Sequence, residues 1–325
     1  MDSFVSLDLL IGLWHGLGWP LVKLLCFVSL GLLVANFIEA LNWTHGVAKL
    51  ASPLIRVGRL PDTVGASFSM AFFSGVAANT MLAEAYDQGI IDKKQLVLAN
   101  LFNSLPTYFL HLPTVFFITA PLIKGAAFIY VGLTFFAAFL RTIFILLVSR
   151  MLLSEVEDRA DPASLLANRE KCGVAEALEK TWKRFRKKIK KIVIFTAPIY
   201  TAIYCLNRLG LFDLLEGLIT RHLGGLSWLH PQSISIVVFH VAAEFSAGLA
   251  AAGALLDGGS LSYRDVVLAL LLGNVVSSPM RAIRHQFPYY AGIFSPKLAV
   301  ELISFSQSFR MGSIILVSVG YYFWG

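Results

Sequence analysis

The chain has 325 residues, of which 57% are hydrophobic and 14% are charged, whereas an ordinary soluble domain has roughly 45–50% apolar and about 25% charged residues. With a mean hydropathy of +0.70, the apolar residues exceed what one soluble core could bury. This composition excludes an ordinary soluble globular protein and predicts that lipid surrounds most of the chain. Three scattered cysteines provide neither a disulfide framework nor metal-ligand spacing.

The positive charge is concentrated in one segment. Residues 150–191 contain twelve Lys or Arg and seven Asp or Glu, so this stretch carries +5 of the formal net charge of +7. Its end, 180–191, has eight basic residues and no acid. Because an apolar stretch follows directly, the positive-inside rule predicts that 150–191 is cytoplasmic and that 180–191 contacts anionic lipid headgroups. This position argues against nucleic acid as a partner.

Long stretches with almost no charge predict an all-α polytopic membrane protein. A spanning helix needs about 20 mostly apolar residues. The stretches that meet this condition are 9–41, 63–86, 96–123 and 125–149 in the first half of the chain, and 192–212, 233–256, 266–295 and 297–324 in the second half. We therefore expect a multi-pass protein of a bacterial-type inner membrane.

The two halves repeat one order of elements: a long helix, a short mixed segment, a helix, a proline-broken stretch and a closing helix. Asp87 matches Asp257 at an offset of 170 residues. Arg141 matches Arg310 at an offset of 169. Such self-similarity predicts an internal duplication. The domains expected are a first membrane repeat over 1–149, a basic connector over 150–191 and a second membrane repeat over 192–325.

Charge also predicts how the repeats are oriented. The segment 45–60 has three basic residues and no acid, so we expect it on the cytoplasmic side. Its counterpart, 212–226, is partly acidic and is expected outside. The N-terminus would then lie outside, and the repeats would have the inverted topology of many secondary transporters. The first half must cross an odd number of times, so one stretch of each half, 96–123 and 266–295, is expected to re-enter rather than span.

Polar residues lie at the same place in both proline-broken stretches. A helix that reaches Pro106 should end or kink near Ser104. The polar residues are Asn103, Ser104 and His111 in the first stretch, and Asn274, Ser277, Ser278 and His285 in the second. Interrupted helices at matching places point to a binding site, although Ser and Asn beside proline also repair broken backbone hydrogen bonds. We expect contacts to substrate, with both histidines as candidates for ion or proton coupling.

Two arginines lie deep in apolar stretches. Arg141 and Arg310 each occupy a position where a cation costs about 2.5–3.5 kcal/mol on the insertion scale unless it faces protein or water. Arg141 precedes Arg150 by nine residues, about 13 Å of helix, which hinders snorkelling to the interface. We expect Arg141 and Arg310 to contact an anion or to form half of an ion pair. Arg281, after the second break, is a further candidate for substrate binding.

Other ionisable and polar residues are weaker candidates. His240 and Glu244 are four residues apart and would share a helix face, as a proton relay or cation site. The alternative is that Glu244 pairs with a buried arginine and stabilises the fold. Asn79, on the matching stretch 63–86, is a candidate substrate contact. No His-Glu-x-x-His pair occurs, so no metal site is expected.

Motifs for nucleotide-driven or enzymatic chemistry are absent from the sequence. There is no Walker motif, no Rossmann glycine signature and no nucleophile elbow. We therefore expect no enzyme, no catalytic residue and no cofactor, and any energy for transport would come from gradients or a partner.

Two segments resemble a known family. Residues 38–106 (IEALNWTHGVAKLASPLIRVGRLPDTVGASFSMAFFSGVAANTMLAEAYDQGIIDKKQLVLANLFNSLP) are similar to the Gate, or nucleoside recognition, domain, and 203–279 resembles a second copy. This domain occurs in concentrative nucleoside transporters, in the membrane part of ferrous iron transport protein B and in spore maturation proteins A and B. The resemblance implies inverted repeats whose broken helices meet near mid-membrane, with solute contacts at the polar tips. The GTPase and the gate cysteines of the iron transporter are missing here.

The sequence favours a gradient-driven transporter or permease for a small polar solute. The arginines favour an anionic solute or headgroup. Alternatives are a nucleoside, a divalent cation, or a non-transporting membrane scaffold or lipid-binding subunit. Homo-oligomers are common among inverted-repeat transporters, and this analogy leaves a homo-oligomer open here.

Overall fold

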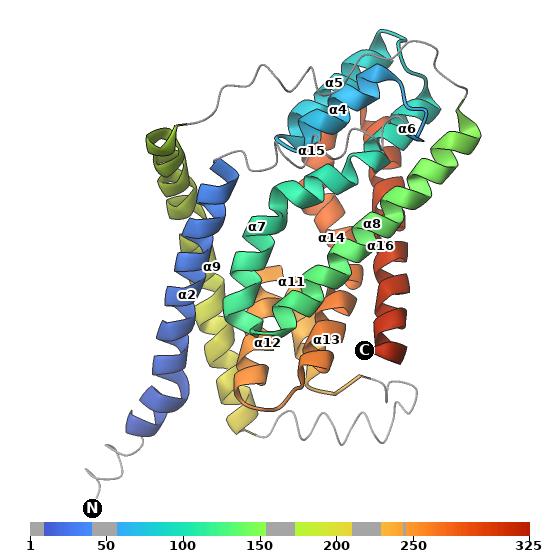
Figure 1. Ribbon diagram of the computed structural model, residues 1–325. Helices are drawn as coiled ribbons and strands as arrows, with labels where there is room; N and C mark the ends of the chain where they lie inside the picture. The colour runs from blue at the N-terminus through green and yellow to red at the C-terminus, as the bar shows by residue number, and fades with distance from the viewer. Residues whose placement is uncertain (1–9, 41–56, 154–172, 210–228, 243–244) are drawn as a thin grey trace, which may run out of the picture.

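The computed structural model describes residues 10–40, 57–153, 173–209, 229–242 and 245–325. Every regular element in these ranges is a helix (Figure 1). This confirms the all-α prediction for the described part of the chain. Of the two segments on which the predicted orientation depends, residues 45–56 of 45–60 and all of 212–226 lie outside it.

The first half contains one long helix and then a chain of helices that reverse direction. Its elements are η1 (Trp14–Gly18), α2 (Trp19–Ala40), α4 (Asp62–Ala71), α5 (Gly75–Asp87), α6 (Lys93–Phe102), α7 (Ser104–Ile123) and α8 (Ala126–Leu152). The second half follows the same order. Its elements are α9 (Val174–Arg208), α11 (Ser233–Ala242), α12 (Phe245–Asp257), α13 (Tyr263–Val276), α14 (Ser278–Arg281), η4 (Ala282–Gln286), α15 (Phe287–Ala291) and α16 (Pro296–Trp324).

Three helical segments in the described residues are long and apolar enough to cross a membrane. They are Lys93–Ile123, Ala126–Leu152 and Pro296–Trp324. On Ala126–Leu152 the outward face carries exposed Phe128, Phe136 and Leu147, side chains that water would solvate poorly and lipid would accept. By length and composition these helices support the prediction of a membrane protein, and the multi-pass inner-membrane arrangement stays a prediction.

Two stretches that we expected to be single helices are each two helices. Residues 63–86 form α4 and α5, and 233–256 form α11 and α12; in each pair the second helix packs back against the first. The Ser74 side chain accepts a hydrogen bond from the backbone N–H of Ala77 and so starts α5 as an N-cap. The single-helix prediction was wrong for both stretches. Glu244 lies outside the described residues, so its predicted position on one helix face with His240 stays a prediction.

The basic segment is continuous with the apolar stretch that follows it. α9 runs without interruption from Val174 to Arg208 and includes the whole of 180–191. The predicted boundary between connector and second repeat, at residue 191, therefore lies inside one helix. α9 packs against α2 and α12.

Several helices of the two halves start at positions 170 residues apart. α5, α6 and α8 start at 75, 93 and 126, and α12, α13 and α16 start at 245, 263 and 296. The turns before α6 and α13 are alike: Gly89 and Gly259 have φ of 72° and 68°, and Asp92 and Ser262 each form a capping box. Figure 1 shows α5 and α6 at one end of the molecule and α12 and α13 at the opposite end.

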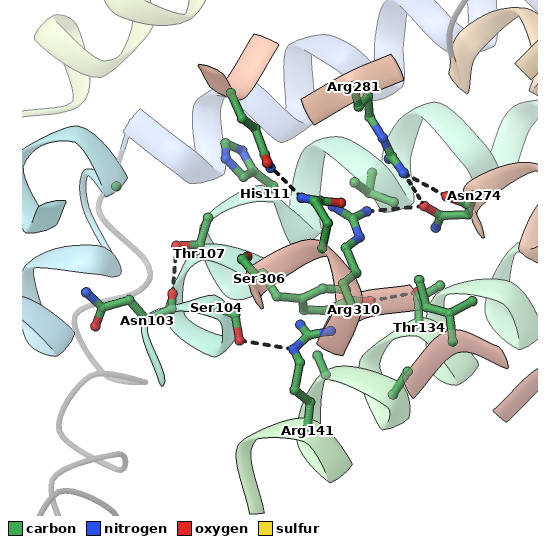
Figure 2. Close-up of a pocket in the computed structure, with 18 of the residues that line it drawn as sticks. Asn103, Ser104, Thr107, His111, Thr134, Arg141, Asn274, Arg281, Ser306 and Arg310 are labelled. Atoms are coloured by element: carbon green, nitrogen blue, oxygen red, sulfur yellow. Dashed lines mark hydrogen bonds between the residues drawn. The ribbon is translucent and has the colours of Figure 1, made fainter. Parts of the chain in front are cut away.

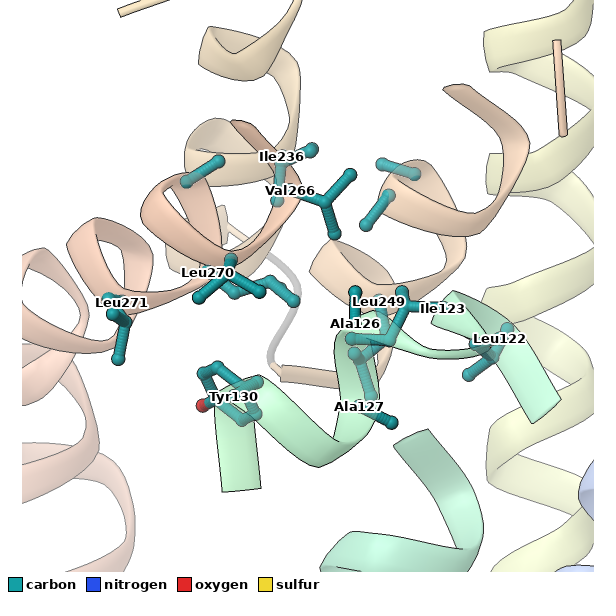
Figure 3. Packing of buried hydrophobic residues seen from close by; sticks show 14 of the residues in the cluster. Leu122, Ile123, Ala126, Ala127, Tyr130, Ile236, Leu249, Val266, Leu270 and Leu271 are labelled. Atoms are coloured by element: carbon teal, nitrogen blue, oxygen red, sulfur yellow. The ribbon is translucent and has the colours of Figure 1, made fainter. Parts of the chain in front are cut away.

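Two apolar clusters hold these helices together. One joins the end of α7 and the start of α8 to α11, α12 and α13, and Leu122, Tyr130 and Leu270 are among its buried members (Figure 3). The other joins α4, α5 and α6 to α15 and α16; in it the rings of Phe68 and Phe102 stack with centroids 4.2 Å apart. The clusters thus lie around the two similar turns.

Both predicted helix breaks are present, and both are short. α6 ends at Phe102 and α7 starts at Ser104, so Asn103 alone interrupts the helix. α13 ends at Val276 and α14 starts at Ser278, followed by the π-helical turn η4. Pro113 and Pro121 lie inside α7 without ending it. The predicted end near Ser104 is confirmed, whereas re-entry of 96–123 or 266–295 stays a prediction.

Candidate functional site

A cavity of about 440 Å³ lies between the two helix breaks. Helices α5 to α8 form one part of its wall, and α13 to α16 form most of the rest. Its volume is within the range of roughly 300–1,000 Å³ typical of small-molecule sites. Eight of the residues predicted from sequence line it: Asn79, Asn103, Ser104, His111, Arg141, Asn274, Arg281 and Arg310.

At the first break, the closing helix of the first half contacts the start of α7. Arg141 Nε donates a hydrogen bond to Ser104 Oγ at 3.2 Å (Figure 2). Its Nη1 donates to Ser313 Oγ at 3.1 Å. Asn103 is buried, and its amide nitrogen donates to Ser67 Oγ at 2.8 Å. Asn103 Oδ1 has no hydrogen-bond partner among the described residues.

At the second break, one side-chain amide oxygen accepts hydrogen bonds from two arginines. Asn274 Oδ1 accepts hydrogen bonds from Arg281 Nη2 at 2.6 Å and from Arg310 Nη2 at 3.3 Å (Figure 2). The Asn274 amide nitrogen donates to the hydroxyl of Tyr130 at 3.2 Å. Arg281 Nη2 also donates to the backbone carbonyl of Asn274 at 2.9 Å. This carbonyl belongs to the last turn of α13, where helix carbonyls lack intrahelical partners.

The cavity has three cations in its wall and no carboxylate among its described lining residues. Within the described residues, none of Arg141, Arg281 and Arg310 forms an ion pair. The ion-pair alternative is therefore not seen in this part of the chain. Glu244, the acid proposed for such a pair, lies outside the described residues.

A second group of polar side chains in the wall includes Asn79, and its other members were not found by sequence reasoning. The Asn100 amide nitrogen donates to Asn79 Oδ1 at 3.0 Å and to the hydroxyl of Tyr290 at 3.1 Å. Gln307 Nε2 donates to Gln286 Oε1 at 2.7 Å. Asn100 is three residues before Asn103, so helical spacing would have placed both on one face.

Four predicted residues do not line the cavity. The hydroxyls of Ser277 and Ser278 donate to the backbone carbonyl of Asn274 at 3.4 and 2.9 Å, so in this structure they supply partners to the broken helix. His285 is exposed. His240 is 2% exposed and lies in the core.

The surroundings of His240 are those of a packed core residue. Its ring is 5.4 Å from that of Phe245, and neither ring nitrogen has a hydrogen-bond partner among the described residues. A Cβ added to Gly273 would lie 2.6 Å from His240 Nδ1, so the helix α13 approaches the ring as closely as a glycine permits. Within the described residues, no group of three His, Cys, Asp or Glu side chains could hold a metal ion.

The comparisons with known proteins give sequence relatives of unknown role. The chain is similar to three uncharacterized proteins of Methanocaldococcus jannaschii. They are 26% identical over 91% of this chain and 97% of the relative, 23% over 92% and 92%, and 27% over 90% and 89%. No family model matches the chain, and no solved structure matches it. The similarity covers both halves and the segment between them.

Proposed function

We propose that this protein is a gradient-driven membrane transporter or permease for a small polar, anionic solute that binds in the cavity between the two helix breaks. The observation that carries the proposal is the group of three arginines without an acidic partner in the described cavity wall. Guanidinium groups bind oxyanions through several N–H donors in a planar fork.

The cost of these charges supports an anion as the occupant. Each cation at membrane depth costs a few kcal/mol unless water or a counterion compensates it. Arg141 and Arg281 come from different halves of the chain, and Arg310 lies on the closing helix of the second half. A bound anion would neutralise charge from both halves at once and thereby favour a closed arrangement around itself.

The repeat arrangement supports transport rather than binding alone. In the proposal the two halves are inverted repeats of a polytopic inner-membrane protein, with 150–191 cytoplasmic, and the resemblance to Gate domains points the same way. Breaks at matching positions beside one cavity are typical of transporters in which one repeat moves against the other around a fixed site.

A nucleoside is the second candidate, because the wall also has an uncharged polar part. Asn79, Asn100 and Tyr290 provide amide and hydroxyl groups, and Phe245 provides an aromatic ring. Such groups suit base edges and ribose hydroxyls. A divalent cation is disfavoured by the three arginines, which would repel it.

Access of water to the cavity tests the proposal directly. In a protein whose cysteines 26, 172 and 205 are replaced by serine, Ser306→Cys introduces a thiol in the cavity wall. Ser304→Cys, on the exposed face of the same helix, is the matched control. A membrane-impermeant thiol reagent added to vesicles should label position 306 from at least one side and leave position 304 unlabelled.

Flux through proteoliposomes then tests transport itself. Inward and outward gradients of phosphate esters, carboxylates and nucleosides should each be imposed, with protein-free vesicles as the reference. Flux of an anion that also protects Ser306→Cys from labelling supports the proposal. An unlabelled Ser306→Cys in folded protein, with no flux above the reference, would favour the scaffold alternative.

A further inference from the structure

We infer that two ion pairs between the halves of the chain close the two ends of the molecule, and that transport breaks one of them at a time. The pairs are Lys93–Glu301, here called the α6 pair, and Lys124–Asp257, here called the α12 pair. This inference rests on the proposed function and specifies what controls access to its site from each side of the membrane.

The two pairs lie at opposite ends of the molecule. Lys93 Nζ lies 2.8 Å from Glu301 Oε2, at the start of α6. Lys124 Nζ lies 2.5 Å from Asp257 Oδ1, at the end of α12. Figure 1 shows α6 and α12 at opposite ends, with α14 between them. None of the four residues lines the cavity, so a change in either pair leaves the wall of the solute site intact.

Each pair joins one of the two similar turns to the other half of the chain. Lys93 follows the turn at Gly89, and its partner is on α16, the closing helix of the second half. Asp257 precedes the turn at Gly259, and its partner lies between α7 and α8 in the first half. The other ion pairs among the described residues lie within α9. In this part of the chain, the halves therefore share one ion pair at each end.

A neighbouring contact repeats this arrangement. Lys93 starts α6, and Tyr263, 170 residues later, starts α13. The Tyr263 ring lies beside the turn before α8, because a Cβ on Gly125 would lie 3.0 Å from its Cε2 atom. At each end, the first residue of a helix thus contacts the closing helix of the other half or the turn that leads to it. In inverted-repeat transporters one repeat moves against the other, and such contacts open on alternate sides.

Neither turn geometry nor helix stability explains these charged residues. Lys124 has a φ of 52°, a conformation that a glycine would adopt with less strain. Strain of this kind is concentrated at clamps and switch regions. Lys93 is the first residue of α6 and Asp257 is the last residue of α12, so each has the charge that the helix dipole disfavours. The contact with the other half accounts for both charges.

The strength of the pairs suits repeated opening. Their side chains are between 31% and 56% exposed, so water screens each pair and its stabilisation is small. Two states interconvert readily only when their free energies differ little, and a contact that breaks in each transport cycle must therefore be weak. Because the two pairs are similarly exposed, neither end is closed much more firmly than the other by its ion pair.

The orientation assigns a side to each pair. Figure 1 shows α8 running toward the end of the molecule where α6 lies. The segment 150–191, which follows α8, is cytoplasmic in the proposed function. The α6 pair would then close the cytoplasmic side, and the α12 pair would close the external side.

The side from which a cavity thiol reacts tests this assignment. The protein is the full chain with Ser306→Cys and the native cysteines replaced, in vesicles, and a membrane-impermeant thiol reagent is added from one side. Asp257→Asn should raise the rate of labelling from the external side about two- to fivefold, as expected for the loss of one exposed ion pair, and should not raise it from the cytoplasmic side. Glu301→Gln should raise labelling by a similar factor from the cytoplasmic side alone.

Matched variants separate the ion pairs from their turns and from loss of charge. Asp87→Asn is the same change at the equivalent position of the first half, where no ion pair with a described residue is present. Glu179→Gln breaks an ion pair within α9. Both should leave both labelling rates unchanged. Exchange of the charges, Lys93→Glu together with Glu301→Lys, should return labelling from the cytoplasmic side to the starting rate.

The outcomes distinguish this inference from the proposed function. Labelling that rises from the same side in Asp257→Asn and Glu301→Gln, or in neither, would overturn the role of the pairs if both proteins keep the wild-type melting temperature and transport an anion. Ser306→Cys that stays unlabelled from both sides in every folded variant, without flux, would overturn the proposed function as well.

Discussion

Arg310 Nη2 donates a hydrogen bond to Asn274 Oδ1 at 3.3 Å, joining the closing helix of the second half to its helix break. The first half has the same relationship: Arg141 bonds to Ser104 at 3.2 Å. Ser104 and Asn274 are 170 residues apart, and the arginines 169. Each half thus uses one arginine of its longest apolar helix to contact its own break, and the two contacts meet in one cavity.

Replacing either arginine should weaken anion binding. A hydrogen bond to a charged group contributes about 1.5–3 kcal/mol, so Arg141→Gln and Arg310→Gln should each reduce affinity roughly 10- to 100-fold. Lysine in place of either arginine keeps the charge but loses the planar fork, and should give an intermediate loss. Calorimetric titration of the solute measures the effect.

The control for these variants is Arg264→Gln. Arg264 lies over the ring of Tyr322, away from the cavity, and its loss should leave anion affinity unchanged. Without anion, Arg310→Gln should melt no lower than the wild type, because it removes one of three neighbouring cations. A large fall in the melting temperature of the empty protein would show that Arg310 stabilises the fold instead.

Gly253 should not tolerate a side chain. A Cβ at this position would lie 2.8 Å from the backbone carbonyl oxygen of Leu122, which cannot move without shifting α7. We expect Gly253→Ala to destabilise the protein by about 1–3 kcal/mol, as overpacking does. Gly312→Ala is the matched helical control, because nothing lies within 4 Å of its Cβ position. Unfolding followed by tryptophan fluorescence in detergent should show a lower midpoint for Gly253→Ala alone.

The two similar turns should respond alike to substitution. Gly89 and Gly259 have φ of 72° and 68°, and a Cβ at either would meet no atom within 4 Å. Alanine therefore costs only backbone strain, about 1–2 kcal/mol at either position. Asparagine tolerates this conformation better and should cost less. Thermal melting of the four single variants measures this, and unequal alanine costs would show that the turns are not equivalent.

The variant His240→Leu distinguishes a role of His240 in core packing from a role in coupling solute flux to an ion or proton gradient. Because both ring nitrogens lack partners among the described residues, leucine should maintain or raise stability, since a buried unpartnered polar group costs about 1–3 kcal/mol. We expect solute flux to persist and to keep its dependence on the imposed ion gradient. If the His240→Leu protein is folded and its flux no longer depends on the gradient, His240 takes part in ion or proton coupling.

Local chemistry made the helix breaks predictable from sequence. Pro106 lacks a backbone donor and crowds the preceding turn, so the end of a helix near Ser104 follows from the residue alone. Arg141 and Arg310 were predictable for a similar reason, because a cation inside an apolar stretch must face protein or water. These residues do line the cavity.

What sequence reasoning missed depends on packing between distant segments. The turn between α4 and α5 contains Phe72, Phe73 and Ser74, and Gly75 follows at the start of α5. A Ser-Gly pair is a turn signal, but inside a long apolar stretch it was not read as a reversal. Tyr290 bonds to Asn100 across 190 residues, and no periodicity relates the two. Ser277 and Ser278 have the polarity of binding residues, but their direction toward the Asn274 carbonyl is set by the three-dimensional course of the break.

In the proposed function the arginines select a negatively charged solute, and its transport would respond to membrane voltage. Moving one elementary charge across the membrane changes its energy by about 2.3 kcal/mol per 100 mV, so a dianion gains or loses about 4.6 kcal/mol. With the cell interior negative, voltage alone drives the dianion outward. Uptake would be independent of voltage if two monovalent cations crossed with each dianion, or if an equal negative charge left in exchange. In the proposed function, the arginines that select the charge of the solute would therefore also decide the direction in which voltage drives it.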